Sequence, residues 1–253
     1  LTSEGAKTTD MTEAISPQSN IRMITESTSL SGFFNKLTDP DGVVRKIPMA
    51  IRFRETLYAP LSLKAVSAYL DAPLAIRVGD SGIESVRVGD LSIPVDDRGE
   101  MIINYRGPEQ TFTHIPATDI LNDRVPEEAL RDKIVLIGAT AIGIHDECVT
   151  PLAKVFPGPE VHLKIMDSIL AGDFIFHPVW AFIFDLMIIV LGGMLLAVVL
   201  SRTGAFSGGV AAVALFGGYI WLCQYFFSHM GWMLNMVYPL CVFLAIYLAV
   251  TSY

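Results

Sequence analysis

The chain has 253 residues, 52% of them hydrophobic, and a formal net charge of -8 at pH 7. Only two charged residues, Asp185 and Arg202, lie beyond position 177, so an acidic first part precedes a nearly charge-free apolar part. The acidic surface excludes nucleic acid as a partner, because binding to phosphates requires a basic face. The apolar part is typical of membrane helices, which makes the lipid bilayer an expected partner.

The composition along the chain predicts three regions. Residues 1–31 are rich in Thr, Ser and Glu with little periodicity, so we expect a flexible polar N-terminal segment. Residues 32–177 are predicted to form an α/β domain with a mixed sheet. Residues 178–253 are predicted to form a membrane domain, so the fold class is an α/β domain followed by a bundle of transmembrane helices.

A tight turn is the clearest local motif in the α/β domain. Asp39, Asp41 and Gly42 lie between two strand-like runs, at residues 32–37 and 43–51, and predict a hairpin. The aspartates can cap the turn through their side chains, and Gly42 supplies a positive φ. Arg45 offers both aspartates a counter-ion for a small polar site. We favour a structural role, because carboxylates in turns usually bond only their own backbone.

Short elements fill the middle of the α/β domain. Pro60 begins a predicted amphipathic helix over residues 59–70, with Leu63, Val66 and Leu70 on its apolar face. Strands separated by turns rich in Gly and Asp are predicted at residues 74–78, 85–88, 91–95 and 101–105. Short helical pieces are predicted at residues 117–122 and 126–130.

Residues 133–137 are predicted to be the core strand of the domain. They form an apolar run after a leading lysine, which is typical of a strand covered on both faces. Gly138 ends the run and begins a polar loop, and a helix with a broad apolar face is predicted over residues 161–171, with Gly172 after its end. Strand, loop and helix in this order form half of a doubly wound α/β unit.

Five polar residues are candidate ligand contacts. Thr140, His145 and Asp146 follow the predicted core strand, and ligands usually bind beyond the carboxyl end of such a strand. Tyr105 and Arg106 end an earlier strand, and the guanidinium of Arg106 offers paired donors to a carboxylate or phosphate. We therefore expect these side chains to bound a ligand crevice.

The structural alternatives to these roles stay open from sequence. Arg106 can instead pair with a structural acid such as Asp119. The consecutive residues 145–148 include four potential ligand types, but neighbours in sequence cannot all face one metal ion. No phosphate-binding loop with a Gly-Lys-Ser/Thr end and no serine nucleophile elbow is present. We therefore predict no metal, no cofactor and no enzymatic activity.

Three membrane spans are predicted in the apolar part, at residues 179–200, 205–227 and 233–251. At ~1.5 Å per residue, each covers about the ~30 Å of bilayer hydrocarbon. An odd number of spans places the α/β domain and the C-terminus on opposite sides. Arg202, in the first linker, indicates that this linker is cytoplasmic and the α/β domain is outside the cytoplasm.

Small and charged residues inside the spans predict how the helices associate. Glycines such as Gly192 and Gly208 allow helices to approach closely, either within the chain or across a homo-oligomer, and we favour packing within the chain. Asp185 lies near the start of the first span, where a carboxylate is usually paired or close to the headgroups. A proton relay is the alternative, and it requires partners that the sequence does not reveal.

Four motifs, in order and spacing, resemble a known family. They are residues 32–48 (Gly-Phe-Phe-Asn followed by Asp-Pro-Asp-Gly-Val-Val-Arg-Lys-Ile-Pro), 103–108 (Ile-Asn-Tyr-Arg-Gly-Pro), 133–151 and 157–162 (Pro-Gly-Pro-Glu-Val-His). Together they are similar to the second type of CHASE sensory domain, over residues 32–173. This resemblance implies an extracytoplasmic sensor followed by three spans, attached to a bacterial adenylate cyclase, histidine kinase or serine/threonine kinase.

The resemblance also defines what residues 1–31 lack. Family members usually begin with a transmembrane helix and a strand-helix-strand stretch, and nothing in this segment resembles it. We therefore expect an upstream segment or a partner chain to complete the sheet. The resulting hypothesis is a sensory module in the bacterial inner membrane that binds a small ligand or an extracytoplasmic protein and acts on a cytoplasmic effector. The alternative is a non-catalytic anchoring subunit of a larger membrane complex.

Overall fold

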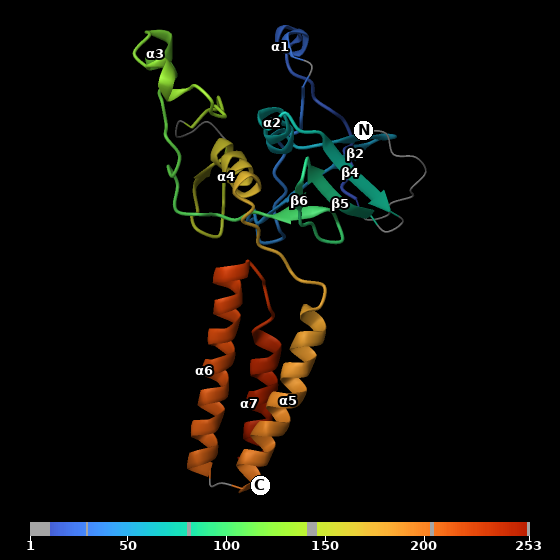
Figure 1. Ribbon diagram of the computed structural model, residues 1–253, viewed down its shortest axis with the longest axis vertical. Coiled ribbons are helices and arrows are strands. Elements are labelled where there is room, and N and C mark those ends of the chain that lie inside the picture. Colours follow the sequence, from blue (N-terminus) through green and yellow to red (C-terminus); the bar gives the residue numbers. More distant parts are fainter. Residues whose placement is uncertain (1–10, 29, 80–81, 141–145, 203–204, 252–253) are drawn as a thin grey trace. The chain divides into compact units, whose positions relative to one another are not determined.

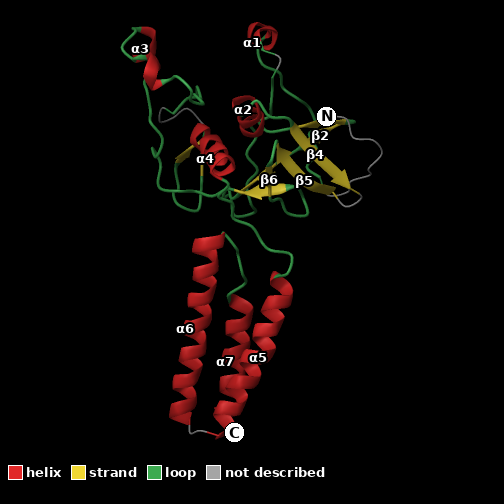
Figure 2. Cartoon of the chain, viewed as in Figure 1, coloured by secondary structure: helices red, strands yellow, loops and turns green. Residues whose placement is uncertain are grey.

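The computed structural model describes residues 11–28, 30–79, 82–140, 146–202 and 205–251. The chain divides into two compact units, Leu1–Phe174 and Ile175–Tyr253. The first is an α/β unit with small sheets, and the second is formed by apolar helices (Figures 1 and 2). Each unit is described by itself.

All strand pairings between the described elements of the α/β unit are antiparallel. They join β1 (Lys46–Pro48) to β7 (Glu100–Ile102), β2 (Ile51–Phe53) to β3 (Thr56–Tyr58), β4 (Leu74–Gly79) to β5 (Gly82–Val88) and then β6 (Leu91–Ile93), and β8 (Glu147–Cys148) to β9 (Phe156–Pro157). The predicted mixed sheet is confirmed only in part. The paired strands are all antiparallel, and parallel pairing occurs only in isolated bridges among the described residues, such as that between Val43 and Val149.

Helix α4 (Gly158–Ala171) is the central helix of the α/β unit. It packs against α2 (Leu61–Tyr69), and Figure 1 shows the two side by side. Val161, Ile165 and Ile169 follow the helical repeat, and each has no exposed side-chain surface. The left-handed Gly172 ends the helix at φ 64°, as predicted. Outside this core lie α1 (Arg22–Ser27), α3 (Ala117–Leu121) and a short 3₁₀ turn, Glu127–Ala129.

The turn after Asp39 is present, but it does not join two paired strands. The Gly42 N–H donates to the Asp39 carbonyl (2.8 Å), the Asp39 N–H donates to the Val43 carbonyl (2.9 Å), and Gly42 has a φ of 82°. Residues 32–37 were predicted as a strand, and this is wrong, because only Phe33 makes a bridge there. Strand β1 takes β7 as its partner instead, so the hydrogen bonds of a hairpin are not available.

The N-terminal segment is not wholly a loose tail. Met11 is only 7% exposed and belongs to the core of the α/β unit. The Arg52 N–H donates to the Thr12 carbonyl (3.0 Å), and the Ala14 N–H donates to the Arg52 carbonyl (2.8 Å). Glu13 also pairs with the Arg52 guanidinium. Residues 11–14 therefore dock along β2, and the flexibility of residues 1–31 stays a prediction.

The predicted core strand at residues 133–137 is wrong. These residues carry no strand assignment, and among the described residues none of their backbone groups bonds to another backbone group. Val135 is 49% exposed and Ile137 is 92% exposed, while Ile134 packs against the core. The physical reason is that a strand needs a neighbouring strand for its N–H and C=O groups, and none lies beside it in the part of the chain described here. Within the described residues, the predicted half of a doubly wound unit therefore does not form either.

The helical unit contains α5 (Ala181–Arg202), α6 (Ala205–Met230) and α7 (Val237–Thr251). Two of its described helices are long and apolar enough to span a membrane, and α7, with 15 residues, is shorter than the predicted third span. A Cβ added at Gly192 would lie 2.5 Å from the Phe243 ring, so α5 and α7 pack closely there. Gly192 therefore shows the favoured packing mode, which is contact between helices within the chain.

Asp185 is the buried charge of the helical unit. Its side chain is on α5 and the residue is 6% exposed. Asn235, between α6 and α7, donates its amide to the carboxylate at 2.8 Å, and the Tyr219 hydroxyl on α6 lies 3.4 Å from it. The Tyr219 hydroxyl also donates to the Asn235 carbonyl at 2.8 Å. The carboxylate is therefore paired, as expected for an acid at this position.

Candidate functional site

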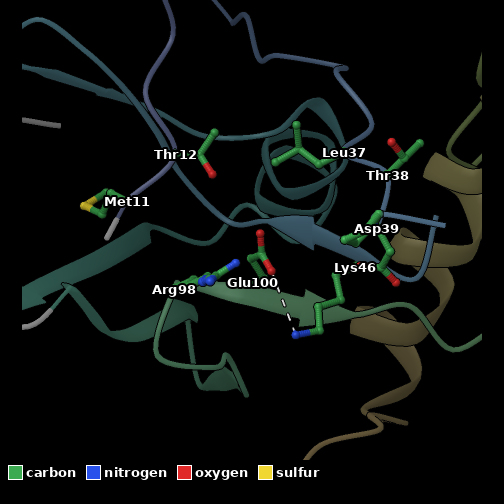
Figure 3. Close-up of a pocket in the computed structure, with 9 residues that line it drawn as sticks. Met11, Thr12, Leu37, Thr38, Asp39, Lys46, Arg98 and Glu100 are labelled. Atoms are coloured by element: carbon green, nitrogen blue, oxygen red, sulfur yellow. Dashed lines mark ion pairs between the residues drawn. The ribbon is translucent and has the colours of Figure 1, made fainter. Parts of the chain in front are cut away.

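A cavity of about 580 Å³ opens in the α/β unit beside the Asp39 turn (Figure 3). Met11 and Thr12 line one side, and Leu37, Thr38, Asp39 and Pro40 line the other. Lys46, Arg98 and Glu100 form the charged floor. Residues far apart in sequence meet here, because residues 11–14 dock along β2 while β1 pairs with β7. The volume is within the ~300–1,000 Å³ typical of small-molecule pockets.

A single aspartate shapes the floor of the cavity. The Asp96 carboxylate accepts the N–H groups of Arg98 and Glu100, both at 3.0 Å, while the Gly99 N–H donates to the Asp96 carbonyl at 2.8 Å. Gly99 has a φ of 75°, which permits the sharp return into β7. This aspartate-capped turn carries Arg98 and Glu100, which are two residues apart and both line the cavity.

The charges of the floor are unequally paired. Lys46 Nζ lies 2.6 Å from the Asp96 carboxylate but 3.9 Å from that of Glu100. Burial opposes ionisation of Asp96, but the hydrogen bonds from Lys46 and from the backbone lower its pKa below the usual value. Burial, followed by the nearby Asp96 charge, raises the pKa of Glu100. Lys46 is thus committed to Asp96, and Glu100 lacks a close partner.

Arg98 makes no close ion pair among the described residues, although its charge partly offsets the rise in the pKa of Glu100. The Arg98 side chain makes no hydrogen bond or ion pair with any other residue that the structure describes. Figure 3 shows the Arg98 guanidinium next to Glu100, on the floor of the cavity. Among the described residues, the cavity therefore has one cation without an ion pair and one weakly paired carboxylate on the same surface.

The Asp39 turn beside the cavity has its charges fully paired. Arg45 lies 2.7 Å from the carboxylate of Asp39 and 2.7 Å from that of Asp41. The hydrogen bond from Arg45 lowers the pKa of Asp41 to about 2. The structure brings together the residues predicted as a small polar site, and Asp39 also lines the cavity.

Tyr105 and Arg106, predicted as ligand contacts, have partners within the protein. The Tyr105 hydroxyl donates to the Val44 carbonyl at 2.9 Å, and burial raises its pKa. Arg106 forms an ion pair with Asp173 and lies 3.8 Å from Asp167. The structural partner suggested from sequence, Asp119, is wrong, because that carboxylate pairs with Arg124 instead. A role for Tyr105 and Arg106 in ligand binding stays a prediction.

The loop after residue 137 holds the other predicted contacts. Thr140 is exposed, and His145 lies outside the described residues. Asp146 forms an ion pair with Lys36, and its carbonyl accepts the Gly158 N–H at 2.7 Å. In the part of the chain that the structure describes, no hydrogen bond or ion pair joins Thr140 or Asp146 to Tyr105 or Arg106. The four candidates that the structure describes are thus not gathered by direct contacts.

A glycine and a histidine border this loop. A Cβ added at Gly138 would collide with Pro159, so the chain passes close to the start of α4 there. His162 on α4 is 5% exposed, and its Nε2 lies 3.2 Å from the Phe34 carbonyl. Burial lowers the pKa of His162, so the neutral form is favoured. No cluster of metal-binding side chains is present among the residues described.

A comparison with protein families identifies the chain. The model of the CHASE2 domain matches residues 3–199. The chain belongs to the CHASE2 domain family. CHASE2 domains are extracytoplasmic, non-catalytic sensory domains, which agrees with the resemblance found in the motifs. No curated protein and no solved structure matches the chain.

The CHASE2 match is longer than the resemblance read from sequence at both ends. It includes the docked residues 11–14 and most of α5, whereas the motifs cover residues 32–173. Sequence reasoning named Asp39 but missed the cavity floor formed by Lys46, Arg98 and Glu100. The signal for this floor is the Asp-Asp-Arg-Gly-Glu run at residues 96–100, of which residues 97–99 are interpreted from sequence only as a turn between strands.

Proposed function

We propose that this chain is the membrane-anchored sensory module of a bacterial signal-transduction receptor. Membership of the CHASE2 family is the observation that carries the proposal. The α/β unit binds a small ligand or an extracytoplasmic protein, and the cavity beside Asp39 offers a site for the small ligand. The helical unit anchors the module in the inner membrane and transmits the binding event to a cytoplasmic effector.

The proposed route of transmission is α4. It is buried on most of its surface and precedes the apolar helices directly in the sequence. Arg106 pairs with Asp167 on this helix and with Asp173 just after it, and the Lys164 ammonium donates to the Arg106 carbonyl. A packing change in the α/β unit therefore has a rigid element through which to act.

The proposed topology has the α/β unit outside the cytoplasm and three spans, α5, α6 and α7. Two spans, α5 and α6, are long and apolar enough to cross a bilayer, and in this proposal residues 233–236 before α7 complete the third crossing. Alkaline phosphatase joined after Asp173 is expected to be active, and the same enzyme joined after Thr251 inactive. Activity at both positions would overturn the odd number of spans.

The decisive experiment uses the whole receptor. Deletion of residues 11–174 is expected to abolish the change in effector output that extracytoplasmic stimuli produce, while the remaining helices still insert in the membrane. Immunoblotting of membrane fractions controls for insertion. Unchanged output under every stimulus would contradict the sensory function.

A second function, a non-catalytic anchoring subunit, is favoured by one observation. Val135 and Ile137 expose apolar side chains on a segment with no assigned helix or strand, and a partner protein can cover such side chains. Purification from native membranes separates the two functions. A stoichiometric partner without any effector domain would favour the subunit.

A further inference from the structure

Two groups of opposite charge in the cavity beside the Asp39 turn, Arg98 and Glu100, have no close ion pair among the described residues. The cavity lining has two cations, Lys46 and Arg98, and two carboxylates, Asp39 and Glu100. Lys46 is paired with Asp96 at 2.6 Å, and Asp39 is paired with Arg45 at 2.7 Å. What remains for a ligand is one guanidinium and one carboxylate.

These two groups select the charge of the ligand. A guanidinium binds a carboxylate through parallel hydrogen bonds, which is a strong and directional contact. An ammonium group would give Glu100 the close counter-ion that it lacks, since Lys46 lies 3.9 Å away. A ligand that is only an anion would bring its charge close to Glu100, and one that is only a cation would bring its charge close to Arg98. A zwitterion satisfies both groups.

The walls select the rest of the ligand. Met11, Leu37 and Pro40 give apolar surface above the charged floor, and Thr12 and Thr38 add hydroxyl groups. Figure 3 shows Leu37 and Thr12 on the side of the cavity opposite Lys46 and Glu100. Burial of an apolar side chain against this surface adds affinity in proportion to the area removed from water.

We propose that the cavity binds a free amino acid with an apolar side chain, with the ligand carboxylate on Arg98 and the ligand ammonium on Glu100. This inference rests on the proposed sensory function and names the ligand class of the same module. The extracytoplasmic position of CHASE2 domains makes such a ligand accessible from outside the cell.

The test measures binding to the full chain in lipid nanodiscs by calorimetry. The probes are L-leucine, 4-methylpentanoate, which lacks the ammonium, and 3-methylbutylamine, which lacks the carboxylate. Leucine is expected to bind at least about tenfold more tightly than either analogue, because each analogue leaves one charge of the floor unpaired. Equal binding of leucine and 4-methylpentanoate would overturn the proposal in favour of a simple anion site, and no binding of leucine would also overturn it.

Substitutions locate the binding in the cavity. Arg98→Ala and Glu100→Gln are each expected to weaken leucine binding about tenfold or more. Arg87→Ala and Glu84→Gln, at exposed positions on β5, are matched controls and are expected to bind as the parent chain does. Leucine binding that all four variants retain would place the ligand elsewhere and overturn the assignment.

The outcome is separable from that of the proposed function. Calorimetry reads binding without an effector, whereas the deletion of residues 11–174 reads output without a known ligand. A receptor that loses its response on deletion but does not bind leucine keeps the sensory function and loses this ligand class. Leucine binding together with unchanged output on deletion would keep this ligand class and contradict the sensory function.

Discussion

Two pairs of charged side chains in the α/β unit are arranged in opposite ways. On α4, Glu160 and Lys164 are each 1% exposed. The Glu160 carboxylate accepts the backbone N–H groups of Gln110 (2.9 Å) and Thr111 (3.0 Å). Lys164 donates to a backbone carbonyl and lies 5.0 Å from the centre of the Phe112 ring. In the cavity, Arg98 makes no hydrogen bond or ion pair with another described residue, and Glu100 has only the distant Lys46, at 3.9 Å.

The difference separates structural charges from candidate binding charges. Buried charges are tolerated when hydrogen bonds replace the water that they lose, and the pair on α4 meets this condition. The pair in the cavity does not, and an incompletely paired charge at a cavity is the arrangement that a ligand can complete. Substitution is therefore expected to cost stability on α4 and binding in the cavity.

The largest expected effect is on α4. Glu160→Ala leaves two backbone N–H groups without acceptors and removes the carboxylate beside Lys164, so we expect a loss of about 3 kcal/mol in the unfolding free energy of the α/β unit. Thermal unfolding by circular dichroism measures the loss, and hydrogen exchange should increase at residues 110–111. Glu109→Ala, at an exposed position, is the control and should change little. A loss no greater than that of the control would show that Glu160 is not structural.

The next effect extends the comparison to the helical unit. Asp185→Leu removes the acceptor of the Asn235 amide and is expected to cost about 1–2 kcal/mol. Tryptophan fluorescence during unfolding in detergent reports on this unit, because all three tryptophans belong to it. Asp185→Asn keeps an oxygen acceptor for Asn235 and should recover part of the loss. Equal stability of the Leu variant and the parent would assign Asp185 to function rather than packing.

Local sequence patterns predicted the helices and strands whose formation depends on residues nearby in the sequence. The helical repeat predicted α2 and the buried face of α4. The alternation of short strands with turns rich in Gly and Asp predicted β4, β5 and β6. Each of these elements finds its partners nearby in sequence, or buries a stripe that its own periodicity defines.

Long-range pairing is where sequence patterns failed. Residues 133–137 have a composition suited to a core strand, but a strand forms only where a neighbour supplies hydrogen bonds. The cavity was missed for the same reason, since Met11 and Thr12 reach it only because residues 11–14 dock on β2. Lys46 reaches Asp96 and Glu100 because β1 pairs with β7, which residues 96–100 alone do not reveal.

A smaller effect is expected at Tyr105, which sequence reasoning placed among the ligand contacts. Tyr105→Phe removes the hydrogen bond to the Val44 carbonyl but keeps the ring packed edge-on against Phe156, at 5.7 Å between centroids. We expect a loss of about 1 kcal/mol in thermal unfolding and no change in leucine affinity. Tyr58→Phe, at an exposed tyrosine, is the control. A change in leucine affinity without a change in stability would show that Tyr105 contributes to ligand binding and not to the stability of the fold.

The smallest stability effect has the opposite sign and is expected at Glu100. Its pKa is raised in the folded chain, so the ionised form opposes folding at neutral pH, and protonation relieves this opposition as the pH falls. Glu100→Gln is therefore expected to stabilise the α/β unit at pH 7 by about 0.5 kcal/mol or less, since the group is partly exposed. The gain should disappear as the pH falls through the raised pKa of Glu100, where the parent side chain is neutral too. Unfolding temperatures of both chains across this pH range measure the gain. A variant that is more stable yet binds leucine more weakly would support a binding role, because loss of a purely structural carboxylate would not give this result. A variant that is less stable at pH 7 would show that Glu100, like Glu160, has a structural role.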